Sequence, residues 1–521
     1  MNRISTEILS LIVGHIFEEP KWAWIGLGPP PPAPSYASYA CVSRRLQDVV
    51  EPHNFATLKI RSSELRTFAA IFSSNPYRRT QLRRLVYEVC LPANGDPHAS
   101  HAQNQHAFRC ALRNLADVLA TWERGPNDCG GGYTGRLDLR LLVVWTGRDE
   151  EDGRLGYDFE LFNTTSVRRY LTLQDGVDSQ SDGLPVPVRR VTEFSVAVCP
   201  GLAPTPATIY QLAGLFPNLE SLHFEFCDPA IRRHEMRQEH RLALADGLGS
   251  IRERLPKLRK LWIERQGSTD PWNHGFENQD LCEGGVDILS ASVRQMFQTG
   301  TMTELALMDV LVSPDVFIDN GTCATFPALR RFMIKGGILA PSGKWYYTGN
   351  PAAVEVGSLD FNDPGPDFEA GSDQDSSSDD DLGDEDSSQR DAVANGIRPY
   401  HAWRTRPDTE TFNPLVKAMA DAVLHGMPSL EWGTLEMGIE QHRPVGMIIQ
   451  CCAEGQPFVQ PPDRMREEEP DPDPTDMRRW KVWIGRSTMW QIPDDVAAAW
   501  KEWVGEEGKI ETGSWPPVHS N

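Results

Sequence analysis

The sequence lacks any long apolar run. None of its 521 residues belongs to an uninterrupted apolar stretch near the ~18 residues that a membrane-spanning helix requires, and this excludes a membrane span. A secretory leader is not expected either, because Glu7 and His15 enclose a short apolar stretch that no small-residue cleavage pattern follows. The ten cysteines include no C-x-x-C pair. Thiols spaced this irregularly in a long chain are expected to be reduced, so the sequence predicts a protein of the cytoplasm, the nucleus or both.

An excess of positive charge is also missing. The chain has 51 Lys and Arg against 73 Asp and Glu, a net charge of −22. Residues 360–391 carry a net charge of −12 and residues 463–476 a net charge of −5, so the remaining chain carries only −5. Because nucleic acids and anionic membranes bind clustered Lys and Arg, neither is expected as a partner.

The short motifs that carry familiar chemistry are absent as well. There is no G-x-S-x-G nucleophile elbow, and the three glycines at residues 130–132 lack the Lys-Ser/Thr of a phosphate-binding loop. His234-Glu235 starts like a zinc-protease helix, but Gln238 stands where the second histidine is needed. We therefore expect no catalytic residue, no metal ligand and no cofactor. The alternative is an enzyme with an unfamiliar site.

Two helical patterns occupy the N-terminal 50 residues. Apolar residues recur at helical spacing from Ile4 to Ile16, and Ser5 can cap this first helix. A second helix is expected over residues 36–50, and Pro52 should end it. Between the two, residues 18–35 include four consecutive prolines, which predict a stiff loop. Alternating strand and helix patterns follow, with strands expected at residues 55–60, 85–91 and 137–145 and helices at residues 63–72 and 108–122.

A short motif recurs from about residue 188 onward. An apolar residue, a proline, any residue and a leucine occur in this order at residues 216–219, 255–258, 326–329 and 427–430. Alternating apolar residues follow the leucine, as in a strand with one buried face, and amphipathic helical stretches precede several of the motifs. Helix followed by strand is the unit of a leucine-rich-repeat-like solenoid, so we predict an irregular α/β solenoid of this kind. The alternative is that Pro-x-Leu is common before strands in any α/β protein and does not indicate a repeat.

Composition indicates two further features of the C-terminal half. Residues 357–395 are rich in Asp, Ser and Gly and poor in apolar residues, which predicts a disordered acidic insertion over residues 351–398. A serine with an aspartate three positions later is a pattern that acidophilic kinases recognise. Serines of this kind in the insertion are possible phosphorylation sites: Ser372, Ser376, Ser377 and Ser378. An inert solvated insertion is the alternative.

The sequence divides into six expected segments. They are residues 1–54 with the Pro-rich insertion, the repeat-like region 55–350, the acidic insertion 351–398, the last repeat-like part 399–456, the Pro- and acid-rich linker 457–476, and residues 477–521 with a Trp-rich strand and helix.

The first 92 residues resemble a known family. The stretch Ile4-Ser-Thr-Glu-Ile-Leu-Ser-Leu-Ile-Val-Gly-His-Ile16, followed by Ala40-Cys-Val-Ser-Arg-Arg-Leu46 and Val50-Glu-Pro-His-Asn-Phe55, is similar to an F-box. The continuation through Leu58-Lys-Ile60, Tyr77-Arg-Arg79 and Leu85-Val-Tyr-Glu-Val-Cys-Leu-Pro92 resembles the F-box proteins of filamentous fungi.

This resemblance implies a fold and a function for the N-terminus. An F-box is an all-helical motif that docks on the Skp adaptor of an SCF (Skp–cullin–F-box) ubiquitin ligase, and the rest of the chain would recruit the substrate. The resemblance implies a Skp-type adaptor and through it a cullin as partners, an unidentified protein substrate, and no ubiquitin chemistry on this chain, since such receptors act by positioning. The family's docking positions fall on Ile4, Ile8, Leu9, Ile12, Ile16, Val42 and Leu46.

Three features depart from the family pattern. Its opening Leu-Pro is Ile4-Ser5 here, its usual Trp in the second helix is Leu46, and the Pro-rich insertion between the helices is longer. Each change could lower adaptor affinity by about 1–3 kcal/mol, the scale of one large buried side chain. Two alternatives follow. Residues 4–50 could cap the repeats without binding an adaptor, or the chain could be a non-catalytic interaction scaffold outside ubiquitination with a degenerate F-box.

Overall fold

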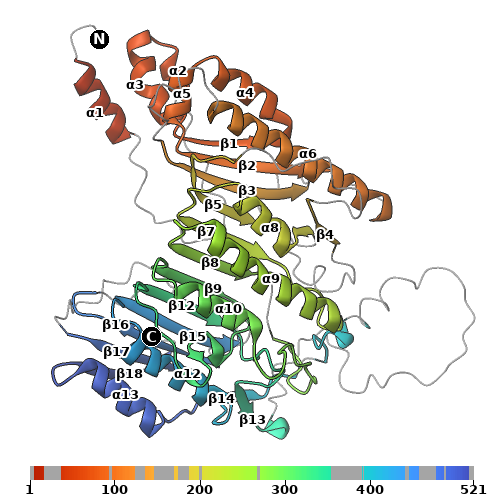
Figure 1. The fold of residues 1–521 in the computed structure, drawn as a ribbon, viewed down its shortest axis with the longest axis vertical. Coiled ribbons are helices and arrows are strands. Elements are labelled where there is room, and N and C mark those ends of the chain that lie inside the picture. The colour runs from red at the N-terminus through yellow and green to blue at the C-terminus, as the bar shows by residue number, and fades with distance from the viewer. Residues whose placement is uncertain are drawn as a thin grey trace, which may run out of the picture.

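One large mixed sheet organises the molecule (Figure 1). The computed structural model describes residues 5–16, 37–92, 97–123, 135–145, 169–173, 187–198, 202–266, 270–353, 390, 392–399, 401–439, 445–456, 477–485 and 488–515. Twelve strands pair in the order β1-β2-β3-β5-β7-β8-β9-β12-β15-β16-β17-β18. In the described part of the chain, no helix is long and apolar enough to cross a bilayer.

The first nine strands of this sheet are parallel and follow each other in chain order. They are β1 (Thr57–Arg61), β2 (Arg84–Leu91), β3 (Leu137–Trp145), β5 (Val191–Ala197), β7 (Ser221–Phe226), β8 (Lys260–Arg265), β9 (Glu304–Met308), β12 (Arg331–Gly336) and β15 (Trp432–Ile439). Strands β16 (Val445–Cys452) and β17 (Arg479–Gly485) then run antiparallel to their predecessors, and β18 (Lys509–Trp515) is parallel to β17.

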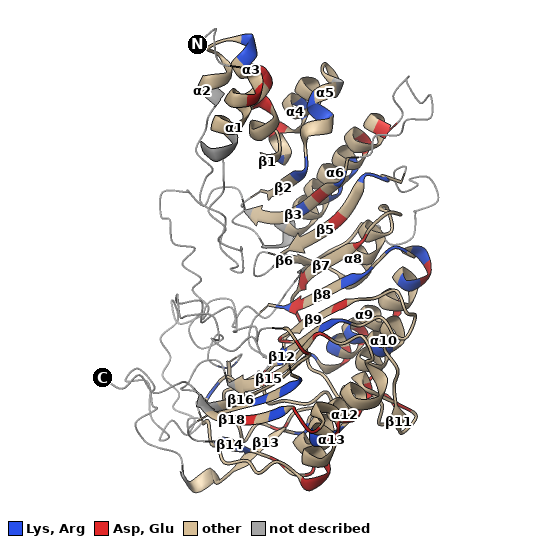
Figure 2. Cartoon of the chain, turned by 90° about the vertical axis from the view of Figure 1, so that its left-hand side faces the viewer, with Lys and Arg blue, Asp and Glu red and all other residues tan. Residues whose placement is uncertain are grey.

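Helices cover one face of the sheet, as two perpendicular views show (Figures 1 and 2). They are α4 (Leu65–Ser73), α6 (Pro97–Glu123), α8 (Pro206–Ala213), α9 (His234–Arg254), α10 (Ile288–Phe297), α12 (Phe412–Asp421) and α13 (Asp494–Val504). Strand residues alternate between the two faces. On β7, for example, Leu222 and Phe224 are fully buried under the helices. Their neighbours His223 and Glu225 therefore project from the opposite side, which is called the second face below.

Short elements complete the fold. The helix α5 spans Pro76–Gln81, and the single turns are η1 (Ser62–Glu64), η3 (Pro314–Val316), η4 (Pro351–Ala353) and η6 (Ala422–Gly426), of which η6 is a π turn that continues α12. Three two-stranded ribbons pair β4 (Arg169–Leu171) with β6 (Leu202–Pro204), β10 (Ile318–Asp319) with β11 (Thr322–Cys323), and β13 (Tyr347–Gly349) with β14 (Arg404–Pro407).

The predicted leucine-rich-repeat-like solenoid is wrong. The strands form one α/β sheet with a single hydrophobic core that extends from Ile60 to Val504. The antiparallel succession β15–β16–β17 also differs from a repeat, because a unit that always returns through a helix produces parallel neighbours.

The Pro-x-Leu motif is instead a turn that leads into a strand. In all four copies the leucine N–H donates to the carbonyl of the apolar residue three positions earlier, over 3.0–3.2 Å. The leucine is buried each time, and a strand starts within two residues: Leu219, Leu258, Leu329 and Leu430. The motif therefore marked the strands of an α/β protein correctly but carried no information about repetition.

The N-terminus does not form the predicted all-helical F-box bundle. Helices α1 (Thr6–Ile16), α2 (Ala37–Ala40) and α3 (Arg44–Asn54) are present. However, α3 runs almost directly into β1 of the main sheet, and Phe55 between them packs on the main core. The three helices are thus an extension of the α/β fold and not a separate helical domain.

Two local expectations in this segment also fail. The second helix was predicted to run unbroken over residues 36–50, but the chain turns at residues 41–43, where the Ser43 hydroxyl accepts a hydrogen bond from the Leu46 N–H over 3.2 Å and caps α3. Pro52 does not end α3 but lies inside its last turn.

The Trp-rich C-terminal segment packs against the body of the molecule. Trp480 of β17 stacks on Trp500 of α13 with ring centroids 4.8 Å apart, and both rings are buried. The Pro-rich segment 18–35, most of the acidic insertion and the linker 457–476 lie outside the described residues.

Candidate functional site

A small apolar cluster joins α1 to α3. Leu9 and Val13 of α1 pack against Val49 and Val50 of α3, and this cluster is separate from the main core. Leu9 and Val13 are at i, i+4 on α1. On α3, Val49 and Val50 follow Leu46, which also packs against the cluster, at i+3 and i+4, so each set lies on one face of its helix. Burying these four side chains holds α1 against α3, at about 1.5–3 kcal/mol for each.

The other side of α1 is apolar as well, but it faces solvent. The exposed fractions of Ile8, Leu11 and Ile12 are 51%, 73% and 47%. Tyr39 of α2 and Val42, in the turn before α3, are 55% and 62% exposed. Eleven large apolar side chains are exposed in the described residues, and these five lie within residues 8–42. These five residues are called the docking surface below.

Polar contacts hold the helices that carry the docking surface. The Ser5 hydroxyl accepts a hydrogen bond from the Ile8 N–H over 3.3 Å at the start of α1. Hydrogen bonds from its own backbone N–H and from Ser5 lower the pKa of Glu7, which lies in the first turn where a negative charge is favoured. Arg45 of α3 donates to the Thr6 hydroxyl over 3.1 Å, which ties the first turn of α1 to α3.

The structure divides the predicted adaptor-binding residues into three groups. Ile8, Ile12 and Val42 belong to the docking surface. Leu9 is buried between the helices and Leu46 packs against the same cluster, so both support the surface from behind. Ile4 and the four serines of the acidic insertion lie outside the described residues, as does the side chain of Ile16.

Leu11 and Tyr39 were missed as surface residues. The helical spacing from Ile4 to Ile16 included Leu11, but spacing alone does not show which side of a helix that is apolar all round will be covered. Tyr39 lies in the second helix that was predicted over residues 36–50, and the turn at residues 41–43 that interrupts this helix leaves Tyr39 exposed.

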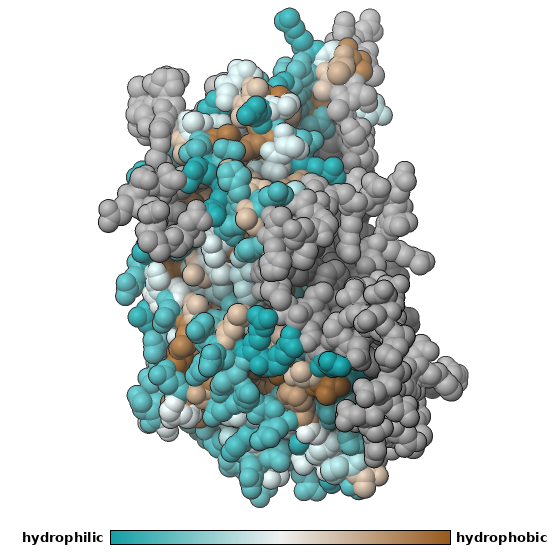
Figure 3. Space-filling view, turned by 90° about the vertical axis from the view of Figure 1, so that its right-hand side faces the viewer, coloured by the Kyte–Doolittle hydropathy of each residue, from teal (hydrophilic) through white to brown (hydrophobic). Residues whose placement is uncertain are grey.

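The second face of the main sheet carries paired charges on neighbouring strands. Arg84 Nε lies 2.7 Å from Asp138 Oδ2, and Lys260 Nζ lies 3.0 Å from Glu304 Oε1. Figure 2 shows the blue and red segments interspersed along the strands instead of one field of a single sign. Figure 3 shows a mostly hydrophilic surface in the described part of the right-hand side of the molecule, with only scattered apolar areas. The described part of the face in Figure 3 shows no large apolar patch.

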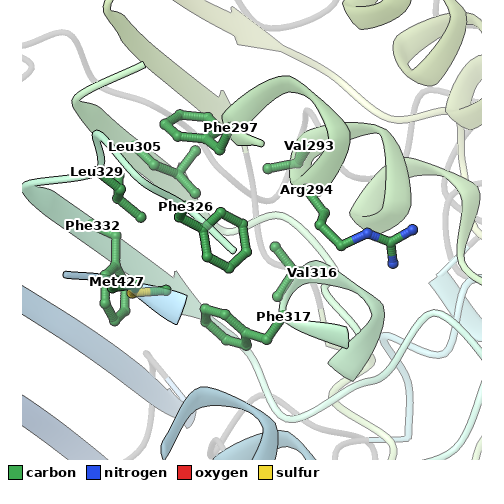
Figure 4. Close-up of a pocket in the computed structure, with 10 residues that line it drawn as sticks. All are labelled: Val293, Arg294, Phe297, Leu305, Val316, Phe317, Phe326, Leu329, Phe332 and Met427. Atoms are coloured by element: carbon green, nitrogen blue, oxygen red, sulfur yellow. The ribbon is translucent and has the colours of Figure 1, made fainter. Parts of the chain in front are cut away.

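A gap in the core beneath α10 is too small for a ligand (Figure 4). Phenylalanine side chains, including Phe297, Phe326 and Phe332, line it together with aliphatic residues. Its free space is about 10 Å³, the lower limit for a single water molecule. The guanidinium of Arg294 points away from the gap and binds Asp319 at 3.0 Å. This gap is part of the packed core.

Buried charges near the carboxyl ends of β7 and β8 form structural ion pairs. Arg241 of α9 donates two hydrogen bonds of 2.7 Å to Asp287, the residue that caps α10. Asp228, just after β7, lies 3.0 Å from Arg265 and 3.7 Å from His240. Although burial raises the pKa of Asp228, the nearby arginines and His240 hold it below its usual value. His240 therefore packs in an ion-pair cluster.

Comparison with known proteins adds no assignment. No family model matches the chain, and no curated protein is significantly similar to it. The resemblance of the N-terminal segment to F-box proteins stays a prediction.

Proposed function

We propose that this chain is a non-catalytic, substrate-recruiting subunit of an SCF-type ubiquitin ligase in the cytoplasm or nucleus, which binds the Skp adaptor through the docking surface. The observation that carries the proposal is the apolar stripe on the solvent side of α1. Contiguous exposed apolar residues of this kind are characteristic of protein interfaces.

The spacing of the stripe fits helix-mediated binding. Ile8, Leu11 and Ile12 stand at i, i+3 and i+4, the pattern with which one helix lies against a groove or a partner helix. Each exposed branched side chain that a partner covers contributes about 1.5–3 kcal/mol. The cluster behind it, with Leu9 and Val13, fixes α1 before the partner arrives, which lowers the entropy lost on binding.

The remainder of the chain would recruit the substrate. The rows of paired charges on the second face suit a polar protein partner better than an apolar ligand. In this proposal the adaptor supplies the link to a cullin, and the chain itself performs no ubiquitin transfer. Phosphorylation of the acidic insertion at Ser372, Ser376, Ser377 or Ser378 would add negative charge to that insertion.

Co-purification tests this proposal in cells of the source organism. The tagged full-length chain should bring down a Skp-type adaptor and a cullin in near-stoichiometric amounts, and the variant Ile8→Asp/Ile12→Asp should lose both. Ile71→Asp is the matched control, because Ile71 is also an exposed isoleucine on a helix (38% exposed) but lies on α4. Recovery of a different helical partner without any adaptor would disprove the ligase assignment.

A further inference from the structure

Three side chains that can bind a metal ion meet on the second face of the sheet. His223 and Glu225 are two residues apart on β7, so both project from the same side of the strand. Glu264 lies on β8 and is the register partner of Glu225 in the parallel pair. The register of two neighbouring strands therefore brings together residues that are about forty positions apart in the sequence.

The distances suit one shared ion. One ligand atom from each of the three residues lies within 4.8 Å of the other two. His223 Nε2 and Glu264 Oε2 are 3.6 Å apart. Two ligands on a tetrahedral zinc with bonds of 2.0–2.2 Å are separated by about 3.4 Å, so this pair is already close to its liganded separation.

Among the described residues, His223 is the only ion-pair partner of these two carboxylates. Glu225 and Glu264 are 6% and 8% exposed, and no Lys or Arg forms an ion pair with either in the described part of the chain. Glu225 accepts a hydrogen bond from the Val198 N–H over 3.1 Å. The Glu264 carboxylate accepts none from the described residues. The side chain of Gln266 also hydrogen-bonds to the Glu225 carboxylate. Two neighbouring buried carboxylates destabilise the folded state, through desolvation and mutual repulsion, unless a cation lies between them.

The imidazole of His223 has its Nε2 atom beside the Glu264 carboxylate. Its Nε2 atom is buried and finds no hydrogen-bond partner among the described residues. The ring lies 4.9 Å from the ring of Trp262, its register partner on β8, and this contact limits its rotation. An imidazole nitrogen beside two carboxylates is a donor set that borderline divalent ions such as Zn²⁺ prefer over Mg²⁺ or Ca²⁺.

We propose that His223, Glu225 and Glu264 form a binding site for one divalent transition-metal ion, best suited to Zn²⁺. Three protein ligands leave a fourth position open for water or for a group from a bound partner. The site lies on the sheet and is independent of the docking surface, so its test does not depend on the function proposed above.

Metal titration of the full-length chain tests the site. After treatment with a chelator, the protein is titrated with ZnCl₂ by calorimetry and by competition with a chromophoric chelator. One equivalent should bind with a Kd at or below micromolar, and the melting temperature should rise on zinc addition. Glu225→Gln and Glu264→Gln should each weaken binding at least tenfold, and His223→Ala should do the same. In cobalt-loaded protein, His223→Ala should also change the visible absorption of the ion.

A neighbouring glutamate provides the matched control. Glu304→Gln removes a carboxylate from the same face on the adjacent strand β9, where it pairs with Lys260, and should leave zinc affinity unchanged. Absence of zinc binding by the wild-type chain would overturn the proposal without any variant. Undiminished binding by Glu225→Gln/Glu264→Gln, or its loss on deletion of residues 360–391 instead, would place the ion elsewhere and also overturn it.

Discussion

Glu51 of α3 and Arg78 of α5 form an ion pair in which Oε1 and Nη2 are 2.7 Å apart, and this pair joins the N-terminal helices to the body of the protein. Gln47 donates to the same carboxylate over 2.7 Å. Burial alone would raise the pKa of Glu51, but the hydrogen bonds from Arg78 and Gln47 lower it. The docking surface is thus held in place by contacts that lie on its opposite side.

Arg78→Met should loosen this attachment. The pair is partly buried, so its loss should lower the free energy of unfolding by about 1–2 kcal/mol. A double-mutant cycle with Glu51→Gln, measured by denaturant unfolding, should give a coupling energy near 1 kcal/mol at neutral pH. Because the pKa of Glu51 is lowered in the folded state, the coupling should be present above the unfolded value of 4.5 and decline as the pH falls below it. A coupling of zero at pH 7 would contradict this account of the attachment.

His274 should make the protein acid-sensitive. The ring is buried, and its Nδ1 accepts hydrogen bonds from the N–H groups of Trp403 and Arg404 over 2.9 and 2.8 Å. Burial, then Arg404 and His401, lower the pKa of His274 from 6.5 to about 3. Between pH 6.5 and pH 3 the unfolded chain therefore binds a proton at this histidine, whereas the folded chain does not. The free energy of unfolding should fall as the pH drops through this range, by at most ~4 kcal/mol.

The variant His274→Asn isolates this contribution. Its side-chain oxygen can accept the same backbone hydrogen bonds but does not titrate. Unfolding free energies measured from pH 7 to pH 4 should therefore decline less steeply in the variant than in the wild type. Parallel declines would assign the acid sensitivity to other groups.

Two glycines of α9 should respond oppositely to alanine. A Cβ atom at Gly247 would lie 1.8 Å from the buried ring of Tyr210, so Gly247→Ala should destabilise the protein by about 1–3 kcal/mol. A Cβ atom at Gly249 would meet nothing within 4 Å, so Gly249→Ala should stabilise by about 0.5–1 kcal/mol through helix propensity. Denaturant midpoints of the two variants measure both effects. Equal midpoints would show that α8 and α9 do not pack as described.

Trp500→Ala should destabilise the whole protein. The ring is buried against Trp480 at the last strands of the sheet, and loss of a buried tryptophan costs about 3–5 kcal/mol. Because a single core extends along the sheet, fluorescence and circular dichroism should report one cooperative transition at a lower midpoint. Met489→Ala is the control, since Met489 is exposed, and should change little. A local loss of signal with an unchanged main transition would indicate that the C-terminal segment folds independently.

The positions of the strands could be predicted from sequence, but their arrangement could not. Alternation after Leu219, Leu258 and Leu329 identified β7, β8 and β12 because one face of each strand is buried under helices. The same alternation is expected for a repeat array and for a single sheet. The antiparallel turn from β15 to β16 changes the topology, yet it leaves the apolar pattern of both strands intact.

The candidate sites were predictable to different degrees. Helical spacing located α1, but the division between its buried Leu9 and its exposed Ile8 depends on where α3 packs. The metal site could not be found from spacing. His223 and Glu225 are separated from Glu264 by a helix and a turn, and only the β7–β8 register brings them together.

The most direct test of the proposed function is the affinity between the purified full-length chain and a purified Skp-type adaptor. Calorimetry should give sub-micromolar binding for the wild type and for Ile71→Asp. Ile8→Asp/Ile12→Asp should lose at least 100-fold in affinity, since two interface side chains would each lose about 1.4 kcal/mol or more. Absence of wild-type binding, or equal affinities for the docking-surface variant and the control, would contradict the assignment.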